Sequence, residues 1–267
     1  MLKKIIFLFI VISLVCIGIS SFAEEKVSNV NISEKLVANL NHVPVVTAAS
    51  PDGKHIAYAV RGEGDQFVVL DGKEQKHYDG IGANLVFSPD SQHFAYRAQL
   101  GDKQFVVLDG KEQKHYDGIG STIAFSPDSQ RIGYAAKIGK ECFIVLDGKE
   151  GKYYESIGSS FAFSPDSKHF AYGVHSDNRE FVVVDGKEGK KYYSIGATMI
   201  FSPESGNLIY WAQSDKKCFV VINEQEQTRY DFIRDGFFLS PDGKHLAYVV
   251  RTGNKWFVVL DGKEGKQ

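Results

Sequence analysis

The sequence has few cysteines and no excess of charge of either sign. Three cysteines occur in 267 residues, and 31 Lys and Arg stand against 33 Asp and Glu, which gives a formal net charge of −2. Such a chain has no positive field that would attract a phosphate backbone, so we expect no nucleic acid among its partners. Hydrophobic residues at 43% and charged residues at 24% are ordinary for a globular protein with a full core.

The sequence also lacks the common catalytic and cofactor-binding motifs. It contains no Gly-x-Ser-x-Gly nucleophile turn, no His-Glu-x-x-His, no Cys-x-x-Cys and no phosphate-binding loop. Four histidines resemble a metal-ligand set but occupy one repeated position: His55, His93, His169 and His245. Side chains that recur once per repeat do not cluster around one ion, as metal ligands must. We therefore expect no metal, no cofactor and no catalytic residue.

Residues 1–23 have the composition of a secretory signal peptide. Lys3 and Lys4 precede an apolar run over 5–19, and small residues at Ser21 and Ala23 precede two glutamates. The apolar run is short for a membrane span, which needs about 20 residues. We expect cleavage of this segment, no membrane span in the mature chain, a linker over 24–35, and a periplasmic or secreted protein.

A repeat of 38 residues dominates the rest of the sequence. Ser-Pro-Asp, replaced once by Ser-Pro-Glu, recurs at this interval from Ser50, and a tyrosine and a phenylalanine keep the same interval from Tyr58 and Phe67. Each of the three series has six members. A fixed period of this length is typical of solenoids, propellers and helical arrays.

Within each repeat, apolar residues alternate with a period of two, which predicts strands. The sequence Ser-Pro-Asp-Ser at 88–91 suits a type I turn, and pairs such as Asp109-Gly110 predict two-residue hairpins. We expect four antiparallel strands per repeat, in the second one over 83–87, 92–99, 103–108 and 112–119. Because apolar residues occupy both faces, the sheets should stack, and four strands per radial blade is the plan of a propeller. The predicted fold class is all-β: a six-bladed β-propeller over 36–267.

The repeat register also suggests how the ring closes. Leu40 and Val43 fall at the positions of Tyr78 and Ile81 in the first full repeat. The N-terminal strand is therefore expected to complete the last blade, which would remove an open sheet edge.

The two cysteines after the signal segment are Cys142 and Cys218, which hold the same position in the third and fifth repeats. Equivalent atoms two blades apart should lie beyond the Cα separation of roughly 7 Å that limits a disulfide. No disulfide is expected.

The run Phe-Ser-Pro-Asp-Ser-Lys-His-Phe-Ala-Tyr at 163–172 resembles the WD-like propeller repeat of the TolB family, and related runs return throughout 36–267. The resemblance implies an exported propeller. Proteins of that family also carry an N-terminal α/β domain and dock on a peptidoglycan-associated lipoprotein. Only some twenty residues separate the signal segment from the first repeat here, so neither that partner nor any binding residue is transferred.

Positions at which the repeats differ are the candidates for function, because the fold explains what they share. Trp211 stands where other repeats have small residues or Arg97, and Arg234 and Asp235 replace a glycine and a small residue. We predict a partner-binding surface that includes these four residues, His175 and the variable loops between second and third strands. A packing adjustment or a simple ion pair would also account for the differences.

Residues 67–82 and 105–120 are identical at all 16 positions, and the expected innermost strands, such as 83–85, carry no carboxylate for acid–base chemistry. Repeats this similar favour a scaffold or a multivalent binder over a single asymmetric active site. We therefore predict a non-catalytic propeller that binds a protein or cell-envelope component. A hydrolase acting on a sugar or peptide at the channel mouth, and a structural repeat protein without a specific ligand, are the alternatives.

Overall fold

The computed structural model describes residues 44–204, 206–234 and 236–266. The predicted signal segment, the linker, the strand expected at 36–43 and Asp235 lie outside the described residues. The described residues form strands and turns without helices, which confirms the all-β expectation.

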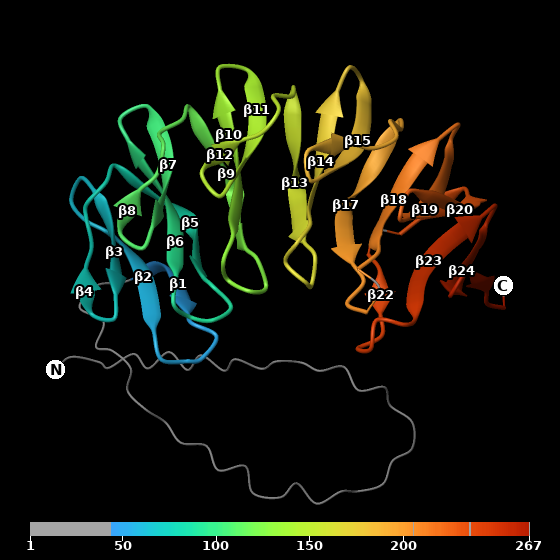
Figure 1. Cartoon of the computed structure of the whole chain (residues 1–267), viewed down its shortest axis with the longest axis horizontal. Coiled ribbons are helices and arrows are strands. Elements are labelled where there is room, and N and C mark those ends of the chain that lie inside the picture. The colour runs from blue at the N-terminus through green and yellow to red at the C-terminus, as the bar shows by residue number, and fades with distance from the viewer. Residues whose placement is uncertain (1–43, 205, 235, 267) are drawn as a thin grey trace, which may run out of the picture. The chain divides into compact units, whose positions relative to one another are not determined.

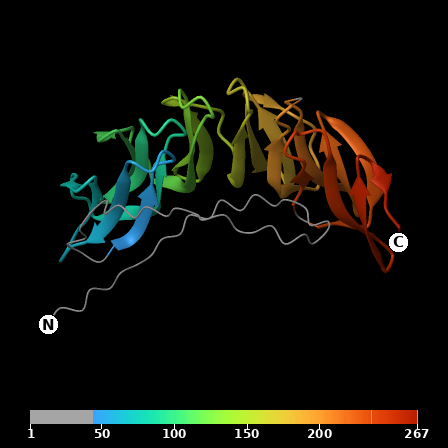
Figure 2. The same cartoon turned by 90° about the horizontal axis from the view of Figure 1, so that it is seen from below.

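The strands form six antiparallel sheets that follow one another in chain order (Figures 1 and 2). The first three sheets are β1 (Pro44–Ala49), β2 (Ile56–Arg61), β3 (Gln66–Leu70) and β4 (Lys73–Glu74); β5 (Gly80–Phe87), β6 (Phe94–Leu100), β7 (Lys103–Leu108) and β8 (Lys111–Glu112); and β9 (Gly118–Phe125), β10 (Ile132–Ile138), β11 (Glu141–Leu146) and β12 (Lys149–Glu150). The fourth and fifth are β13 (Ser156–Phe163), β14 (Phe170–Ser176), β15 (Arg179–Val184) and β16 (Lys187–Glu188); and β17 (Ser194–Phe201), β18 (Leu208–Ser214), β19 (Lys217–Ile222) and β20 (Gln225–Tyr230). The sixth contains β21 (Phe232–Ile233), β22 (Phe238–Leu239), β23 (Leu246–Thr252), β24 (Lys255–Leu260) and β25 (Lys263–Glu264).

The turns have the conformations that the sequence predicts. In the first Ser-Pro-Asp turn, the amide of Gly53 donates to the carbonyl of Ser50 at 2.9 Å. The fourth turn position has a positive φ, 68° at Gly53 and 66° at Ser91, which explains the glycine found there. At the hairpin between third and fourth strands, Asp109 and Gly110 have φ values of 50° and 76°, as a type I′ turn requires.

The fourth strand is shorter than predicted. In the second sheet it covers Lys111–Glu112 rather than 112–119. Beyond it, the amide of Gln113 donates to the carbonyl of Val106 at 2.8 Å, and Gln104 and Tyr116 form an isolated bridge. The Asp117 carboxylate then accepts the amide proton of Gly139, in the third sheet, at 2.6 Å. This bond ties Asp117 to the third sheet, and β9 of that sheet begins at the next residue, Gly118.

Each inner sheet packs on both neighbours, which is the blade arrangement of a propeller. In the second sheet, Tyr96 and Phe105 join a buried cluster with the first sheet, whereas Val106 joins a cluster with the third. Small residues permit close approach of neighbouring sheets. A Cβ atom added to Gly133, for example, would lie 3.0 Å from the ring of Phe170 in the following sheet.

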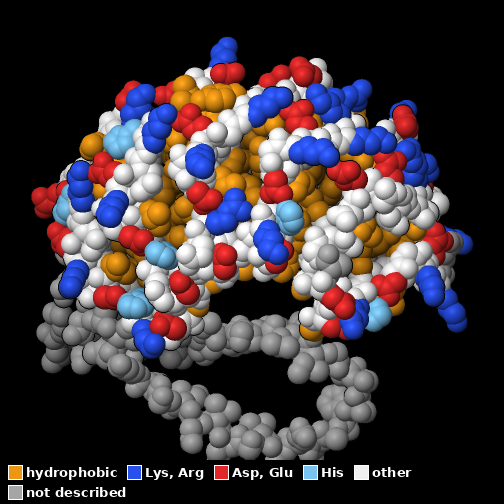
Figure 3. Space-filling view, in the orientation of Figure 1, with side chains coloured by type: hydrophobic (Ala, Val, Ile, Leu, Met, Phe, Trp, Pro, Cys, Tyr) orange, Lys and Arg blue, Asp and Glu red, His pale blue; other side chains and the backbone are white. Residues whose placement is uncertain are grey.

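Polar contacts also join each sheet to the next. The amide of Asp90 donates to Ser129 Oγ at 3.0 Å, and equivalent bonds run from Asp52 and Asp128. Four ion pairs repeat around the outside: Lys76–Glu112, Lys114–Glu150, Lys152–Glu188 and Lys190–Glu226. Figure 3 shows basic and acidic side chains interspersed over the face seen in Figure 1, without a large area of one sign.

The described residues do not close the six sheets into a ring. Neighbouring sheets contact through pairs such as β5 with β9 and β19 with β21, but no extensive contact links the first sheet to the sixth within the described ranges. One face of β24 is accordingly open: Val258 is 48% exposed, whereas the equivalent Val106 is fully buried. The segment expected to close the ring, 36–43, lies outside the described residues.

Candidate functional site

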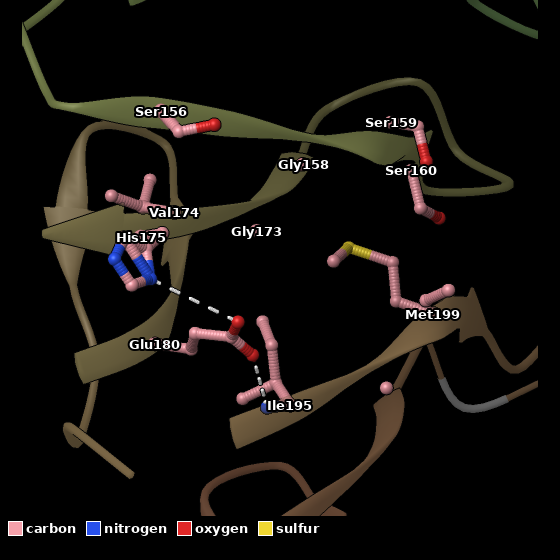
Figure 4. A pocket seen from close by; sticks show the side chains of 12 residues that line it. Ser156, Gly158, Ser159, Ser160, Gly173, Val174, His175, Glu180, Ile195 and Met199 are labelled. Carbon is pink, nitrogen blue, oxygen red and sulfur yellow. Dashed lines mark hydrogen bonds and ion pairs between the residues drawn. The ribbon is translucent and has the colours of Figure 1, made fainter. Parts of the chain in front are cut away.

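A cleft of about 250 Å³ lies between the fourth and fifth sheets, where two glycines leave room (Figure 4). Gly158 on β13 and Gly173 on β14 both line it. Its other lining residues come from the same two sheets: Ser156, Ser159, Ser160, Val174, His175, Glu180, Ile195, Gly196, Ala197 and Met199.

The same space is filled in two other sheets. Arg97 takes the position of Gly173 in the second sheet, lies against Gly82, and donates from its guanidinium to the carbonyl of Ile119 at 2.9 Å. Trp211 takes that position in the fifth sheet and lies against Gly196. In the fourth sheet, Gly158 takes the position of Gly82 and Gly196. The residue that faces it is Gly173, which has no side chain, and so a cleft remains.

The polar end of the cleft is formed by His175 and Glu180. Glu180 Oε2 accepts hydrogen bonds from the amide of Ile195 at 2.7 Å and from Ser194 Oγ at 2.9 Å. His175 Nδ1 lies 3.9 Å from Glu180 Oε1, and its Nε2 lies 3.8 Å from Glu155 Oε2. These two separations exceed hydrogen-bond length, so His175 contacts the carboxylates only as a long ion pair when it is protonated.

The rest of the lining is uncharged. Three serines on β13 supply hydroxyl groups, while Ile195 and Met199 on β17 form an apolar wall opposite them (Figure 4). Glu180 is the only carboxylate and no Lys or Arg is among the lining residues. The arrangement can hold a small group that combines an apolar body with a polar or cationic end.

The structure describes four of the five predicted binding residues and places them in different regions. Arg97 lies between the second and third sheets, where its guanidinium is bound to backbone. Trp211 packs into the core cluster between the fifth and sixth sheets, and the exposed Arg234 follows Ile233 of that cluster. His175 lies in the cleft, and Asp235 is outside the described residues. The structure thus brings Trp211 and Arg234 to one inter-sheet region and His175 to another.

The predicted variable loops do lie beside the starts of the first strands. In the second sheet the amide of Gly101 donates to the Asp79 carboxylate at 2.6 Å, and in the sixth that of Gly253 donates to Asp231 at 2.6 Å. Asp231 is three residues before Arg234, so this loop and Arg234 belong to the same end of the sheet.

Cys142 on β11 and Cys218 on β19 are both free thiols. They belong to the third and fifth sheets, with the fourth sheet between them in chain order. Cys218 is buried, and this burial raises the pKa of its thiol.

Comparison with known proteins supports the fold. No family model and no curated protein matches the sequence. Among solved structures, a eukaryotic initiation factor is 13% identical over 85% of this chain and 65% of its own, with a TM-score of 0.55. TolB from Acinetobacter baumannii is 17% identical over 79% of this chain and 62% of its own, with a TM-score of 0.38. The β-propeller domain of the Trilobed protease from Pyrococcus furiosus, described as having an open velcro topology, is 17% identical over 81% and 78%, with a TM-score of 0.38.

The chain spans less than two thirds of the initiation factor and of TolB, and at these identities the likeness concerns the fold alone. Within the described ranges, no helix is suited to crossing a bilayer.

Proposed function

We propose that this chain is an exported, non-catalytic propeller that binds a protein or a cell-envelope component through the cleft between its fourth and fifth sheets. The observation that carries the proposal is the missing side chain at Gly173, because the fold accepts Arg97 or Trp211 at the same position. The signal-peptide pattern of residues 1–23 supports a periplasmic or secreted location.

The size of the cleft favours a partner protein. Pockets for drug-sized ligands occupy about 300 to 1,000 Å³, whereas this cleft has about 250 Å³. It fits one side chain or a comparably small group. Insertion of one anchoring side chain into a small pocket is a common basis of affinity between proteins.

The lining favours binding over hydrolysis. Glycoside hydrolases commonly place two carboxyl groups on either side of the scissile bond, but Glu180 is the single carboxylate that lines this cleft. Its Oε2 is held by Ser194 and the amide of Ile195, which fixes it as a hydrogen-bond acceptor. We therefore rank the hydrolase alternative below binding.

Gly173→Arg is expected to fill the cleft and remove partner binding. The substitution copies the residue of the second sheet, so the new guanidinium can reach the carbonyl of Ile195 as Arg97 reaches that of Ile119. Loss of a central anchor site costs about 2 kcal/mol or more, which corresponds to a roughly 30-fold or greater loss of affinity. The measurement is capture of partners from an envelope extract, followed by their quantification.

Gln92→Arg is the matched control, because it adds the same charge at an exposed turn of the second sheet. It should capture the same partners as the wild type. If Gly173→Arg, with an unchanged melting temperature, also captures the wild-type partners, the cleft is not the binding site.

We also propose that the six sheets are the blades of a ring closed by residues 36–43. The open face of β24 supports this, because Trp256 and Leu260 are about half exposed at 49% and 50%. In the second sheet, the residue equivalent to Trp256 is Gln104, which bridges to Tyr116. The repeat register assigns Leu40 to that tyrosine position in the last blade.

Leu40→Cys combined with Trp256→Cys is expected to form an intramolecular disulfide in a Cys142→Ser, Cys218→Ser background. Directly paired residues on antiparallel strands have Cα atoms about 5.5 Å apart, which is within the range of a disulfide. Intact mass and non-reducing electrophoresis measure the bond. Two free thiols under oxidising conditions, or covalent dimers alone, would contradict closure by this segment.

A further inference from the structure

We infer that the cleft between the fourth and fifth sheets accepts an aliphatic ammonium group, the side chain of a lysine on the partner protein. This inference rests on the proposed function, in which that cleft is the binding site. It adds the chemical class of the group that enters.

The first argument is the charge of Glu180. The residues at its position in the first two sheets are Gln66 and Gln104, whose Oε1 atoms accept the amide protons of Ile81 and Ile119, both at 3.0 Å. Glu180 accepts the equivalent amide proton, that of Ile195, at 2.7 Å. The other sheets have Cys142, Cys218 and Trp256 at this position, so the fold does not require a negative charge here. We attribute the charge of Glu180 to the ligand.

The second argument concerns the hydrogen-bond partners of the two carboxylate oxygens of Glu180. Oε2 of Glu180 accepts from Ser194 and from the amide of Ile195. Oε1 has only His175 Nδ1 near it, at 3.9 Å, among the ion pairs and hydrogen bonds of the described residues. An arginine fork prefers two free oxygens, whereas an ammonium is a compact charge that one oxygen and neighbouring hydroxyls can satisfy.

The third argument is the rest of the lining. Ser156 and Ser160 provide hydroxyl oxygens, and Ile195 and Met199 provide an apolar wall (Figure 4). A lysine places a four-carbon stem along apolar surface and keeps its charged end near polar groups. The absence of Lys and Arg from the lining leaves no fixed cation to oppose entry.

The charged groups around Glu180 fit the same conclusion. His175 on β14 lies between Glu180 and Glu155, with nitrogen-to-oxygen separations of 3.9 and 3.8 Å. Glu180 lines the cleft, Glu155 lies next to His175, and no Lys or Arg is among the lining residues. The carboxylate of Glu180 favours a positive ligand.

The test uses Nα-acetyl-L-lysine N-methylamide as the probe, with the equivalent norleucine and arginine compounds as comparators. Binding to the full mature chain is measured by NMR from the amide shifts of Glu180 and Ile195. We expect the lysine compound to shift these amides, and the norleucine compound to bind at least about tenfold more weakly because it lacks the charge. The arginine compound is expected to bind more weakly than the lysine compound.

Glu180→Gln is expected to reduce affinity for the lysine compound about tenfold or more with little change in melting temperature. The first two sheets already use glutamine at this position with the same backbone bond. Equal affinity of wild type and Glu180→Gln, or equal affinity for lysine and norleucine compounds, would overturn the inference.

Partner capture separates this inference from the proposed function. If Gly173→Arg loses the partner and Glu180→Gln keeps it, the cleft is the site but lysine is not the group that enters. If both variants keep the partner, the proposed function itself fails. Loss of capture by both variants supports both proposals, provided that acetylation of the extract's lysines also removes capture from the wild type.

Discussion

Phe143→Ala is expected to lower the free energy of unfolding by about 3–5 kcal/mol, the usual cost of removing a fully buried phenylalanine. Phe143 on β11 has no exposed surface and meets the ring of Tyr116 edge to face, with ring centroids 5.4 Å apart. It belongs to the cluster that also contains Val106 of the second sheet. The substitution therefore opens a cavity at the contact between two sheets.

Urea denaturation followed by circular dichroism measures the effect. Tyr193→Ala is the control, because Tyr193 is 67% exposed and its replacement should change stability by no more than about 0.5 kcal/mol. Similar unfolding midpoints for Phe143→Ala and Tyr193→Ala would contradict the assignment of this cluster to the core.

Acidification is expected to destabilise the fold steeply, because carboxylates at repeated positions are held in their charged form. In the Ser-Pro-Asp turns the serine hydroxyl donates to the aspartate, as from Ser88 to Asp90 at 2.5 Å, and this lowers the pKa of the carboxyl below its ordinary value of 3.8. The same direction and first cause hold at four further turns: Asp52, Asp128, Asp166 and Asp242. Between sheets, the lysine partner lowers the pKa of the glutamate below its ordinary value of 4.5 at Glu112, Glu150, Glu188 and Glu226.

A carboxyl whose pKa is lower in the folded state stabilises the fold above its unfolded pKa, and this contribution is lost as the pH falls through the folded value. Histidines whose pKa is raised act in the opposite sense. The pKa of His77 is raised first by Asp65, and that of His245 by Asp261, so their contribution is present below 6.5 and is lost as the pH rises through the folded value. We therefore expect the melting temperature to peak between pH 4.5 and 6.5 and to fall steeply below 4.

Calorimetry from pH 3 to 8 at constant ionic strength measures this profile. A variant in which Lys76, Lys114, Lys152 and Lys190 are replaced by methionine should be less stable at neutral pH. It should also lose less stability on acidification, because the glutamates then lack the partner that lowers their pKa most. An identical acid slope in this variant would show that the inter-sheet ion pairs do not contribute to the pH dependence.

The period of the sequence was sufficient to predict most of the local structure. Turn residues such as Asp109 and Gly110 have strict conformational requirements, so their positions predict hairpins directly. Alternation of apolar residues predicts strands packed on both faces, which the clusters on either side of the second sheet confirm. The fourth strand was predicted too long because the pattern gives no sign of the bond from Gly139 to Asp117.

The cleft was not predicted, because the sequence pattern distinguishes positions where a repeat gains a distinctive side chain. Trp211 and Arg97 drew attention for this reason, yet both fill space against a facing glycine. The signal lay at Gly173, in the same column of the repeat, where a side chain is missing. The glycine at 173 leaves a cleft only because Gly158 faces it, and these two residues are separated in the sequence and become neighbours only in the folded sheet.

The identity of residues 67–82 and 105–120 has a consequence for how such a chain can change in length. Each sheet contacts its neighbours through residues at equivalent repeat positions. An in-frame duplication of one 38-residue unit would therefore offer both flanking units the contact residues that they already have. Genetic gain or loss of a unit would then require no new interface along the array, and only the two terminal units would have to adapt.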